Sequence, residues 1–280
     1  MRDKLVLIDG HSILNRAFYG VPDFTNSEGT HTNAIFGFLN ILFKIIDEEN
    51  PKYLCVAFDV HQPTFRHEMY KEYKGTRKPM LPELKQQVPL MKEMLKALNI
   101  KTTELAGFEA DDILGTLSKA GEEQGLEVSV ISGDRDLLQL ATEHVKIRIP
   151  KTKKGKTEIE DYNVTQVLEK YSVTPKEFID VKALMGDSSD NIPGVPGIGE
   201  KGATTIISEY GSIENAYAHV EEIKPNRAKE ALRNHYDMAK MSKKLATICV
   251  QAPLELSWEN AKLTNLYTPE VYEWFKKLNF

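Results

Sequence analysis

Aspartates stand at the ends of three apolar, β-branched runs in this sequence. Each run has the length and composition of a buried strand. The runs are 5–8, 53–58 and 128–132, and the acids that follow them are Asp9, Asp59, Asp134 and Asp136. The carboxyl ends of parallel strands lie along one edge of a sheet, where open α/β sheets bind ligands. We therefore expect these carboxylates to meet at one edge of an α/β sheet.

Two more acidic groups lie elsewhere in the chain. They are Glu109, Asp111 and Asp112, at the start of a helix predicted to run to about residue 123, and Asp187 and Asp190 in the loop-like segment 186–191. Taken singly, each group has a simpler explanation, because acids favour turns, helix N-termini and Asx-type loops. Together they would crowd like charges that repel unless a cation neutralises them. We therefore predict a site for Mg²⁺ or Mn²⁺, which prefer oxygen ligands.

The charge distribution supports the same interpretation. The formal net charge is −5, but setting aside the nine candidate carboxylates leaves +4 on the rest of the protein. The nine are Asp9, Asp59, Glu109, Asp111, Asp112, Asp134, Asp136, Asp187 and Asp190. A mildly basic body around one acidic pocket suits a metal-dependent enzyme that acts on nucleic acid.

The remaining composition argues against several other classes. The two cysteines, Cys55 and Cys249, do not predict a disulfide framework or a zinc site. No run approaches the roughly 20 apolar residues of a membrane-spanning helix. The first residues do not resemble a signal peptide. We expect a cytoplasmic protein with no membrane partner.

The order of predicted elements separates a mixed α/β body from a helical part. A helix predicted at 32–47 joins the first two strands in a βαβ unit. Residues 60–80 are basic, interleaved with aromatics, and lead into a long amphipathic helix at about 82–98. From about residue 163 the apolar spacing is helical. We predict a body over 1–165 and a helical subdomain over 166–280. Smaller predicted elements are a helix from His11 to Tyr19 capped by Ser12, a strand near 100–104 and a basic hairpin turn at 151–156.

A glycine-rich segment at 192–203 is the second strong feature. Gly197 and Gly199 permit a tight turn at the start of a helix, whose backbone N–H groups can bind phosphate. The missing side chains let a nucleic-acid backbone approach closely, and Lys201 can add a phosphate contact. The simpler alternative is an ordinary helix–loop–helix turn with convenient glycines.

These motifs, taken in order, resemble one family. They are Leu-Ile-Asp9-Gly, Ala-Phe-Asp59, Phe-Arg66, Tyr73-Lys74-Gly, Gly-Phe-Glu109-Ala-Asp111-Asp112, Ser-Gly-Asp134-Arg-Asp136 and Gly-Asp187-Ser-Ser-Asp190-Asn-Ile-Pro-Gly-Val-Pro-Gly197-Ile-Gly199-Glu-Lys201. The chain resembles the 5′-nuclease (flap endonuclease) superfamily over nearly its whole length. It is most similar to the 5′→3′ exonuclease domains at the N-termini of bacterial DNA polymerases I. One departure is Gly202, where relatives often carry threonine.

The resemblance implies a fold and a set of site residues. The fold is a PIN-like α/β body with a central, mostly parallel twisted sheet, a helical arch over about 60–98, and a helix–three-turn–helix subdomain whose DNA-binding motif spans about 186–210. By position, Asp9, Asp59, Glu109, Asp111 and Asp112 correspond to a first metal site and Asp134, Asp136, Asp187 and Asp190 to a second. Lys74 and Arg77 correspond to catalytic residues that contact the scissile phosphate. The implied DNA-binding residues are Arg16, Arg66, Tyr73, Gly197, Gly199 and Lys201, with a potassium ion at the glycine hairpin.

The expected function is structure-selective 5′ nuclease activity with two Mg²⁺ ions, for which Mn²⁺ substitutes. Substrates would be DNA with 5′ flaps or nicked and branched duplexes, and RNA in hybrids, during replication and repair in the bacterial cytosol. The products would carry 5′-phosphate and 3′-hydroxyl ends, and a DNA polymerase would be the covalent partner. One alternative is a non-catalytic DNA-binding module. Another is an aspartyl-phosphate phosphatase, although Asp9-Gly-His11 lacks the second aspartate of that chemistry.

Overall fold

In the computed structural model, residues 1–153, 156–255 and 257–280 are described, and their strands form a six-stranded sheet. The strand order is β3-β2-β1-β4-β5-β6, and all neighbours run parallel except β5 and β6. The strands are β1 (Lys4–Asp9), β2 (Tyr53–Ala57), β3 (Lys101–Thr103), β4 (Glu127–Ile131), β5 (Val145–Lys153) and β6 (Lys156–Tyr162). The predicted α/β fold with a mostly parallel sheet is confirmed.

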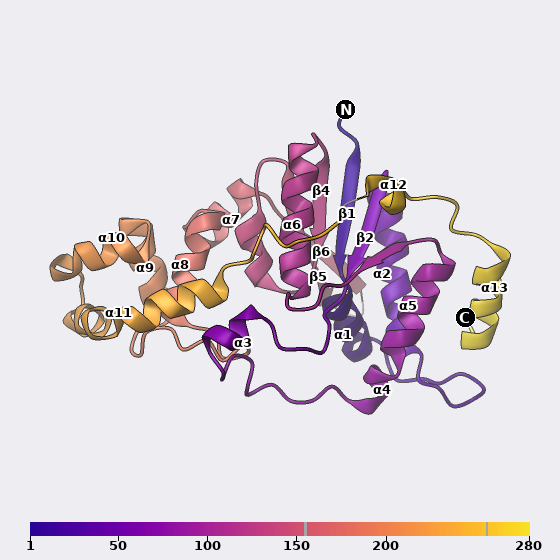
Figure 1. Cartoon of the computed structure of the whole chain (residues 1–280), viewed down its shortest axis with the longest axis horizontal. Coiled ribbons are helices and arrows are strands. Elements are labelled where there is room, and N and C mark those ends of the chain that lie inside the picture. The colour runs from indigo at the N-terminus through magenta and orange to yellow at the C-terminus, as the bar shows by residue number, and fades with distance from the viewer. Residues whose placement is uncertain (154–155, 256) are drawn as a thin grey trace.

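Side chains of β1 alternate between two apolar layers. Val6 and Ile8 belong to one buried cluster, and Leu5 and Leu7 belong to the other. Helices α1 (Gly10–Gly20), α2 (Asn33–Glu49) and α5 (Gln87–Ala97) form the first layer, whereas α6 (Ala110–Glu123) covers the opposite face (Figure 1). A strand buried on both faces needs apolar residues at successive positions, which explains the uninterrupted run at 5–8.

A helical subdomain lies beside the body and shares the apolar cluster on the α6 side of the sheet (Figure 1). Its helices are α7 (Val164–Tyr171), α8 (Pro175–Met185), α9 (Glu200–Tyr210), α10 (Ile213–Ala218), the short 3₁₀ turn η2 (Val220–Glu222) and α11 (Asn226–Ala246). Helix α8 begins with a capping box between Thr174 and Glu177, with proline in its first turn. The predicted change from mixed α/β to helical structure is present.

The chain after α11 returns to the body. Helix α12 (Trp258–Ala261) packs against β2, with the rings of Trp258 and Tyr53 5.7 Å apart. Helix α13 (Pro269–Leu278) buries Val271 and Leu278 in the same cluster as α2 and α5. Residues 258–280 therefore pack on the α/β body, although the sequence division at 165/166 assigned them to the helical subdomain.

The segment between β2 and α5 crosses the carboxyl edge of the sheet (Figure 1). It contains α3 (Phe65–Met69) and α4 (Pro82–Lys85), and α4 is separated from α5 at Gln86, so the single helix predicted at 82–98 is two helices. We call residues 60–86 the arch segment; the arch expected from the resemblance ran to about residue 98, but α5 packs in the same apolar cluster as α2.

Helix α1 is capped by Asp9, not by Ser12 as predicted, because the helix begins directly at the end of β1. The tip of the predicted hairpin turn at 151–156 lies at residues 154–155, outside the described residues. In the described part of the chain, no helix has the length and apolar character needed to cross a membrane.

Candidate active site

The carboxyl edge of the sheet opens into a cleft of about 920 Å³. Strand β1 ends at Asp9, β2 ends two residues before Asp59, and β4 is followed by Asp134, which caps the 3₁₀ helix η1 (Arg135–Leu140). The carboxylate side chains that line the cleft are Asp9, Asp59, Glu109, Asp111 and Asp134. The structure therefore brings together acids from three strand ends and one helix start.

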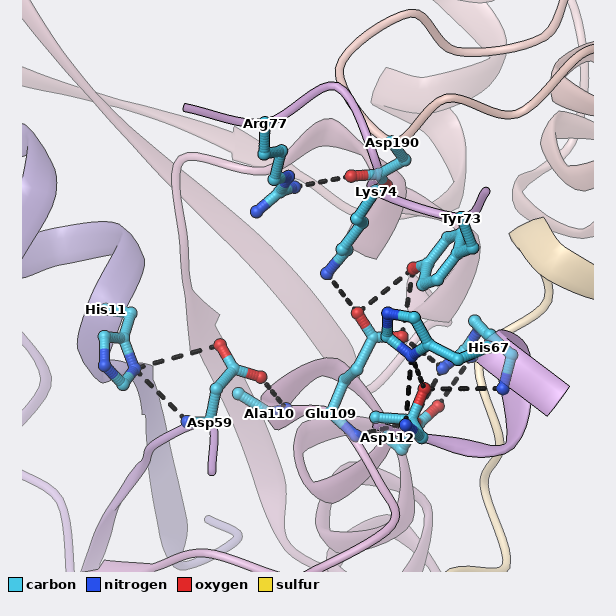
Figure 2. Close-up of polar contacts among 12 residues, drawn as sticks. His11, Asp59, His67, Tyr73, Lys74, Arg77, Glu109, Ala110, Asp112 and Asp190 are labelled. Atoms are coloured by element: carbon cyan, nitrogen blue, oxygen red, sulfur yellow. Dashed lines mark hydrogen bonds and ion pairs between the residues drawn. The ribbon is translucent and has the colours of Figure 1, made fainter. Parts of the chain in front are cut away.

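The start of α6 is joined to the end of β2. Glu109 is the N-cap residue of α6, and the side chain of Asp112 accepts a hydrogen bond from the backbone N–H of Glu109 at 3.0 Å. Asp59 Oδ1 accepts a hydrogen bond from the N–H of Ala110 at 2.7 Å (Figure 2). This arrangement uses the N-terminal donors of the helix and fixes two segments that carry cleft carboxylates.

Burial and mutual repulsion disfavour ionisation of three of the cleft acids, Asp9, Asp111 and Asp134. Burial raises the pKa of Asp9 to about 7, with a further contribution from the charge of Asp59. Burial also raises the pKa of Asp111 well above its usual range, and Asp134 adds to the effect. The pKa of Asp134 itself is raised, mainly by burial. Crowded oxygen donors of this kind fit a divalent cation such as Mg²⁺, because its charge would compensate the repulsion.

A second group of acids lies between η1 and the loop after α8. One carboxylate oxygen from each of Asp136, Asp187 and Asp190 lies within 4.8 Å of the others. Burial, and then the charge of Asp134, raises the pKa of Asp136 to about 7. Burial alone would raise the pKa of Asp187, but hydrogen bonds from Ser189 and the charge of Lys182 lower it. These three acids also fit a cation site.

Arg66 and Asp112 form a buried ion pair outside the lining of the cleft. Arg66 is 2% exposed and Asp112 is 0% exposed. The guanidinium group donates to both Asp112 oxygens at 2.8 and 2.9 Å and to Glu109 Oε2 at 2.5 Å. It also donates to the backbone carbonyls of Leu245 and Thr247 at 2.9 and 2.8 Å. The structure thus places Asp112, which the resemblance assigned to a metal site, outside the lining of the cleft, and it buries Arg66, which the resemblance assigned to DNA binding.

Three arch residues point toward carboxylates of the two acid groups (Figure 2). The ammonium group of Lys74 bonds to Glu109, and the guanidinium group of Arg77 donates to Asp190 Oδ1 at 2.5 Å. The hydroxyl of Tyr73 donates to Glu109 at 3.0 Å, and Tyr73 is only 4% exposed. Lys74 and Arg77 line the cleft, whereas Tyr73 is buried behind Glu109.

The other predicted residues lie outside the lining of the cleft. Gly197 has a φ of +93°, a conformation that favours glycine, and Gly199 is the N-cap of α9. A side chain added at Gly199 would meet no atom within 4 Å, so the surface there is open. Lys201 is exposed in the first turn of α9. In the described structure, Arg16 Nε is buried without a hydrogen-bond partner, and burial lowers the pKa of Arg16.

Two family models cover most of the chain. Residues 4–172 match the 5′-3′ exonuclease N-terminal resolvase-like domain, and residues 173–268 match the 5′-3′ exonuclease C-terminal SAM fold. The chain belongs to the 5′-3′ exonuclease family. This membership confirms the family resemblance drawn from the motifs.

This member of the exonuclease family is similar in sequence to part of a longer protein, DNA polymerase I. It is 51% identical over 280 residues to DNA polymerase I of Bacillus caldotenax and 47% identical over 279 residues to DNA polymerase I of Bacillus subtilis. Each match covers 100% of this chain but 32% of the relative. The chain thus spans about a third of the length of these relatives.

Solved structures share the fold at lower identity. T5 5′-exonuclease with bound zinc superimposes with a TM-score of 0.72 at 22% identity, covering 99% of this chain and 98% of that chain. The catalytic core of Rad2 in complex with DNA gives 0.61 at 17% identity, covering 99% and 88%. The fold of the exonuclease family therefore extends over nearly the whole chain.

Sequence reasoning missed three polar side chains that contact the acids of this exonuclease fold. His11 Nδ1 accepts the N–H of Asp59 at 3.2 Å, and Ser132 Oγ donates to Asp9 Oδ2 at 2.8 Å. Lys182 Nζ lies 3.1 Å from Asp136 Oδ1 and 3.3 Å from Asp187 Oδ2. His11 follows Asp9-Gly, and Ser132 precedes Gly133-Asp134, so their proximity to strand ends could have indicated them. The position of Lys182 depends on the path of α8, which the local sequence does not give.

Proposed function

We propose that this chain is a structure-selective 5′ nuclease that hydrolyses phosphodiester bonds of DNA, and of RNA in hybrids, at 5′ ends and flap junctions. The observation that carries the proposal is the convergence of cleft carboxylates with Lys74 and Arg77, which enter from the arch segment. A carboxylate cluster alone could be structural. The positively charged side chains of Lys74 and Arg77 extend toward this cluster from a separate segment, and such groups can bind a phosphate.

The carboxylates would hold divalent metal ions, and we propose Mg²⁺ with Mn²⁺ as a substitute. Asp9, Asp59, Glu109 and Asp111 would form one site, and Asp136, Asp187 and Asp190 the second, with Asp134 between them. We leave Asp112 out of the first site because, unlike Glu109, it does not line the cleft, and both of its oxygens bond to Arg66. When bound, such ions lower the pKa of a water molecule and neutralise charge on the leaving oxygen.

The chain's own cations would act on the phosphate. Lys74 and Arg77 lie beside the acids that would hold the metals, so their positive charges would stabilise the phosphoryl oxygens as charge develops in the transition state. Burial opposes the charge of Lys74, but Glu109 and Asp190 raise its pKa. Lys74 therefore stays protonated at neutral pH and acts as an electrostatic group, not as a general base.

The duplex would lie on the helical subdomain. The exposed backbone at Gly197 and Gly199, the open space at Gly199 and the exposed Lys201 support contacts to phosphates without base readout, with a potassium ion at this hairpin. We propose that residues 166–280 contain this duplex-binding unit and that residues 1–165 contain the catalytic body. Because the relatives named DNA polymerase I are about three times as long, we also propose a DNA polymerase as the covalent partner.

The test is a cleavage assay on a 5′-labelled flap duplex, beside matched single-stranded and blunt DNA, with Mg²⁺ or with EDTA. We expect Mg²⁺-dependent release of short labelled products that end in a 3′-hydroxyl, with the new 5′-phosphate on the strand that remains in the duplex. Binding of the flap without cleavage under Mg²⁺ or Mn²⁺ would support the alternative of a non-catalytic DNA-binding module and reject the nuclease.

The hairpin contact predicts a change in salt dependence. Replacing Lys201 with alanine should weaken flap binding and reduce the slope of log K against log [salt] by about 0.9, the value for one lost phosphate contact. Fluorescence anisotropy over a range of KCl concentrations measures the slope. Lys96→Ala, an exposed lysine on α5, is the control and should leave the slope unchanged. An unchanged slope for Lys201→Ala would remove Lys201 from the interface.

Metal binding should depend on pH because several of the proposed ligand acids, among them Asp9 and Asp136, have raised pKa values. Asp9 and Asp136 each have a pKa of about 7 in the folded protein, well above their usual value. Without metal, the folded protein therefore loses stability as the pH rises from about 4 to 7, because folding then opposes the ionisation of these acids. Metal requires their ionised forms. At about pH 5.5 each acid should lower the apparent Mn²⁺ affinity by roughly 30-fold relative to pH 8.

Calorimetric titration and melting curves at both pH values test this expectation. The increase in Tm caused by Mn²⁺ should be larger at the higher pH. Asp9→Asn should raise Tm in the absence of metal at the higher pH and reduce the increase that Mn²⁺ gives. Equal increases at both pH values would show that these acids do not bind the metal.

A further inference from the structure

One turn of the arch segment is bound along its length to the loop after α8. The turn comprises residues 72–77 and the loop comprises residues 187–191. The contacts are Lys74 N–H to the Asp190 carbonyl at 2.8 Å, Asn191 Nδ2 to the Glu72 carbonyl at 2.8 Å, Arg77 Nε to the Ser189 carbonyl at 3.3 Å and Thr76 Oγ1 to the Ser188 carbonyl at 3.5 Å. More than a hundred residues of sequence separate the turn from the loop, so tertiary structure alone brings them together.

The turn and the loop each contain one residue whose backbone conformation is rare for residues other than glycine. Lys74 has a φ of 56° and Asn191 a φ of 55°, both in the left-handed region. Such conformations persist where the surroundings fix them. For Lys74 the fixing contacts are its own N–H bond to Asp190 and the bond from the N–H of Gly75 to the Glu72 carbonyl at 2.8 Å. In this turn the Lys74 side chain points to Glu109 (Figure 2).

We propose that Asn191 is a positioning residue that holds the arch turn so that Lys74 and Arg77 point into the cleft. The role of these two cations rests on the proposed nuclease function. Asparagine suits the position for two reasons: it tolerates the left-handed conformation, and its amide supplies the donor to Glu72. Glycine would keep the conformation without the donor. Aspartate would lack the donor and add a negative charge beside Asp190.

The contact links two parts of the proposed chemistry in one loop. Asp190 contributes its carboxylate to the second acid group and its backbone carbonyl to the arch turn. Asn191, the next residue, secures the other end of the same turn. The placement of a metal ligand and the placement of the arch cations therefore depend on the same five-residue loop.

Amide hydrogen exchange without DNA tests the contact directly. In Asn191→Gly, peptides covering residues 70–79 should exchange roughly three- to tenfold faster, the effect of losing one hydrogen bond. Asn50→Gly is the matched control, because Asn50 also has a positive φ, 45°, but ends α2 on the surface. The control should leave exchange in this region unchanged. Unchanged exchange in Asn191→Gly would overturn the proposal.

Single-turnover cleavage of the flap duplex tests the positioning role. Asn191→Gly should slow cleavage roughly tenfold while leaving flap affinity within about twofold, since the hairpin contacts are untouched. In a background that lacks both arch cations, with Lys74→Ala and Arg77→Ala, the same substitution should slow cleavage less than about twofold, because residues that act together are not additive. Equal slowing in both backgrounds would indicate a general structural role and overturn the proposal. If the unmodified chain does not cleave, the nuclease function fails, whereas the exchange result still decides whether Asn191 holds the turn.

Discussion

Replacing Asp134 with asparagine should reduce the rate of flap cleavage by about a thousandfold or more, because it removes a charge between the two acid groups. Asp134 raises the pKa of Asp9, Asp111 and Asp136, so its carboxylate acts on both groups at once. A side chain in that position would contribute to both metal sites. Its loss should therefore affect the reaction more than the loss of an acid that belongs to one group.

The substitution should leave the fold intact. Asp134 Oδ1 accepts the N–H of Asp136 at 2.8 Å and caps η1, and the asparagine carbonyl oxygen can keep this bond. Removing the negative charge should also lower the pKa values of Asp9 and Asp111. Tm without metal should thus be unchanged or higher, and flap affinity should remain within about threefold, because phosphate contacts elsewhere dominate binding.

Single-turnover kinetics with saturating Mg²⁺, together with anisotropy measurements of flap binding, test this prediction. Asp237→Asn is the control, because Asp237 is 97% exposed on α11 and pairs only with Lys240 among the described residues. The control should cleave normally. A variant of Asp134 that cleaves within tenfold of the unmodified chain would remove Asp134 from the proposed centre.

The cleft acids were predictable because local patterns determine their position. An apolar run that ends at an aspartate specifies both a strand and the edge at which the carboxylate lies, which was sufficient for Asp9, Asp59 and Asp134. Asp111 and Asp112 show the limit of this reasoning. Adjacent residues of a helix point about 100° apart, so they cannot both face the cleft. The sequence does not indicate which of the two faces it.

Partners distant in sequence decide the remaining roles. The family resemblance implied that Arg66 binds DNA, yet its partners Glu109 and Asp112 lie 43 and 46 residues further along the chain. Lys182 and Asn191 were missed for the same reason. The return of α13 to the body was also not predicted, because its amphipathic pattern does not identify the surface on which it packs.

Replacing Arg66 with alanine should lower the free energy of unfolding by about 3–5 kcal/mol, the usual cost of removing one member of a buried ion pair. The loss would leave Asp112, which is fully buried, and the largely buried Glu109 without their guanidinium partner. It would also leave the carbonyls of Leu245 and Thr247 without their donors. Burial opposes the charge of Arg66, but Asp112 and Glu109 raise its pKa, so the group is charged in the folded protein.

Urea denaturation without metal or DNA measures this loss and separates the two possible roles of Arg66. Arg233→Ala is the control: Arg233 also pairs with two acids, Glu221 and Glu230, but on the surface, so its loss should cost at most about 1 kcal/mol. Arg66→Lys should give an intermediate loss, because an ammonium group keeps the charge without the planar fork that bonds Asp112 at two points. If Arg66 instead served mainly to contact DNA, Arg66→Ala would unfold at the same urea concentration as the unmodified chain and would bind the flap more weakly. Arg66 joins α3, the start of α6 and the end of α11. We therefore expect Arg66→Ala to cause a large loss of stability and to weaken flap binding only under conditions where the protein is partly unfolded.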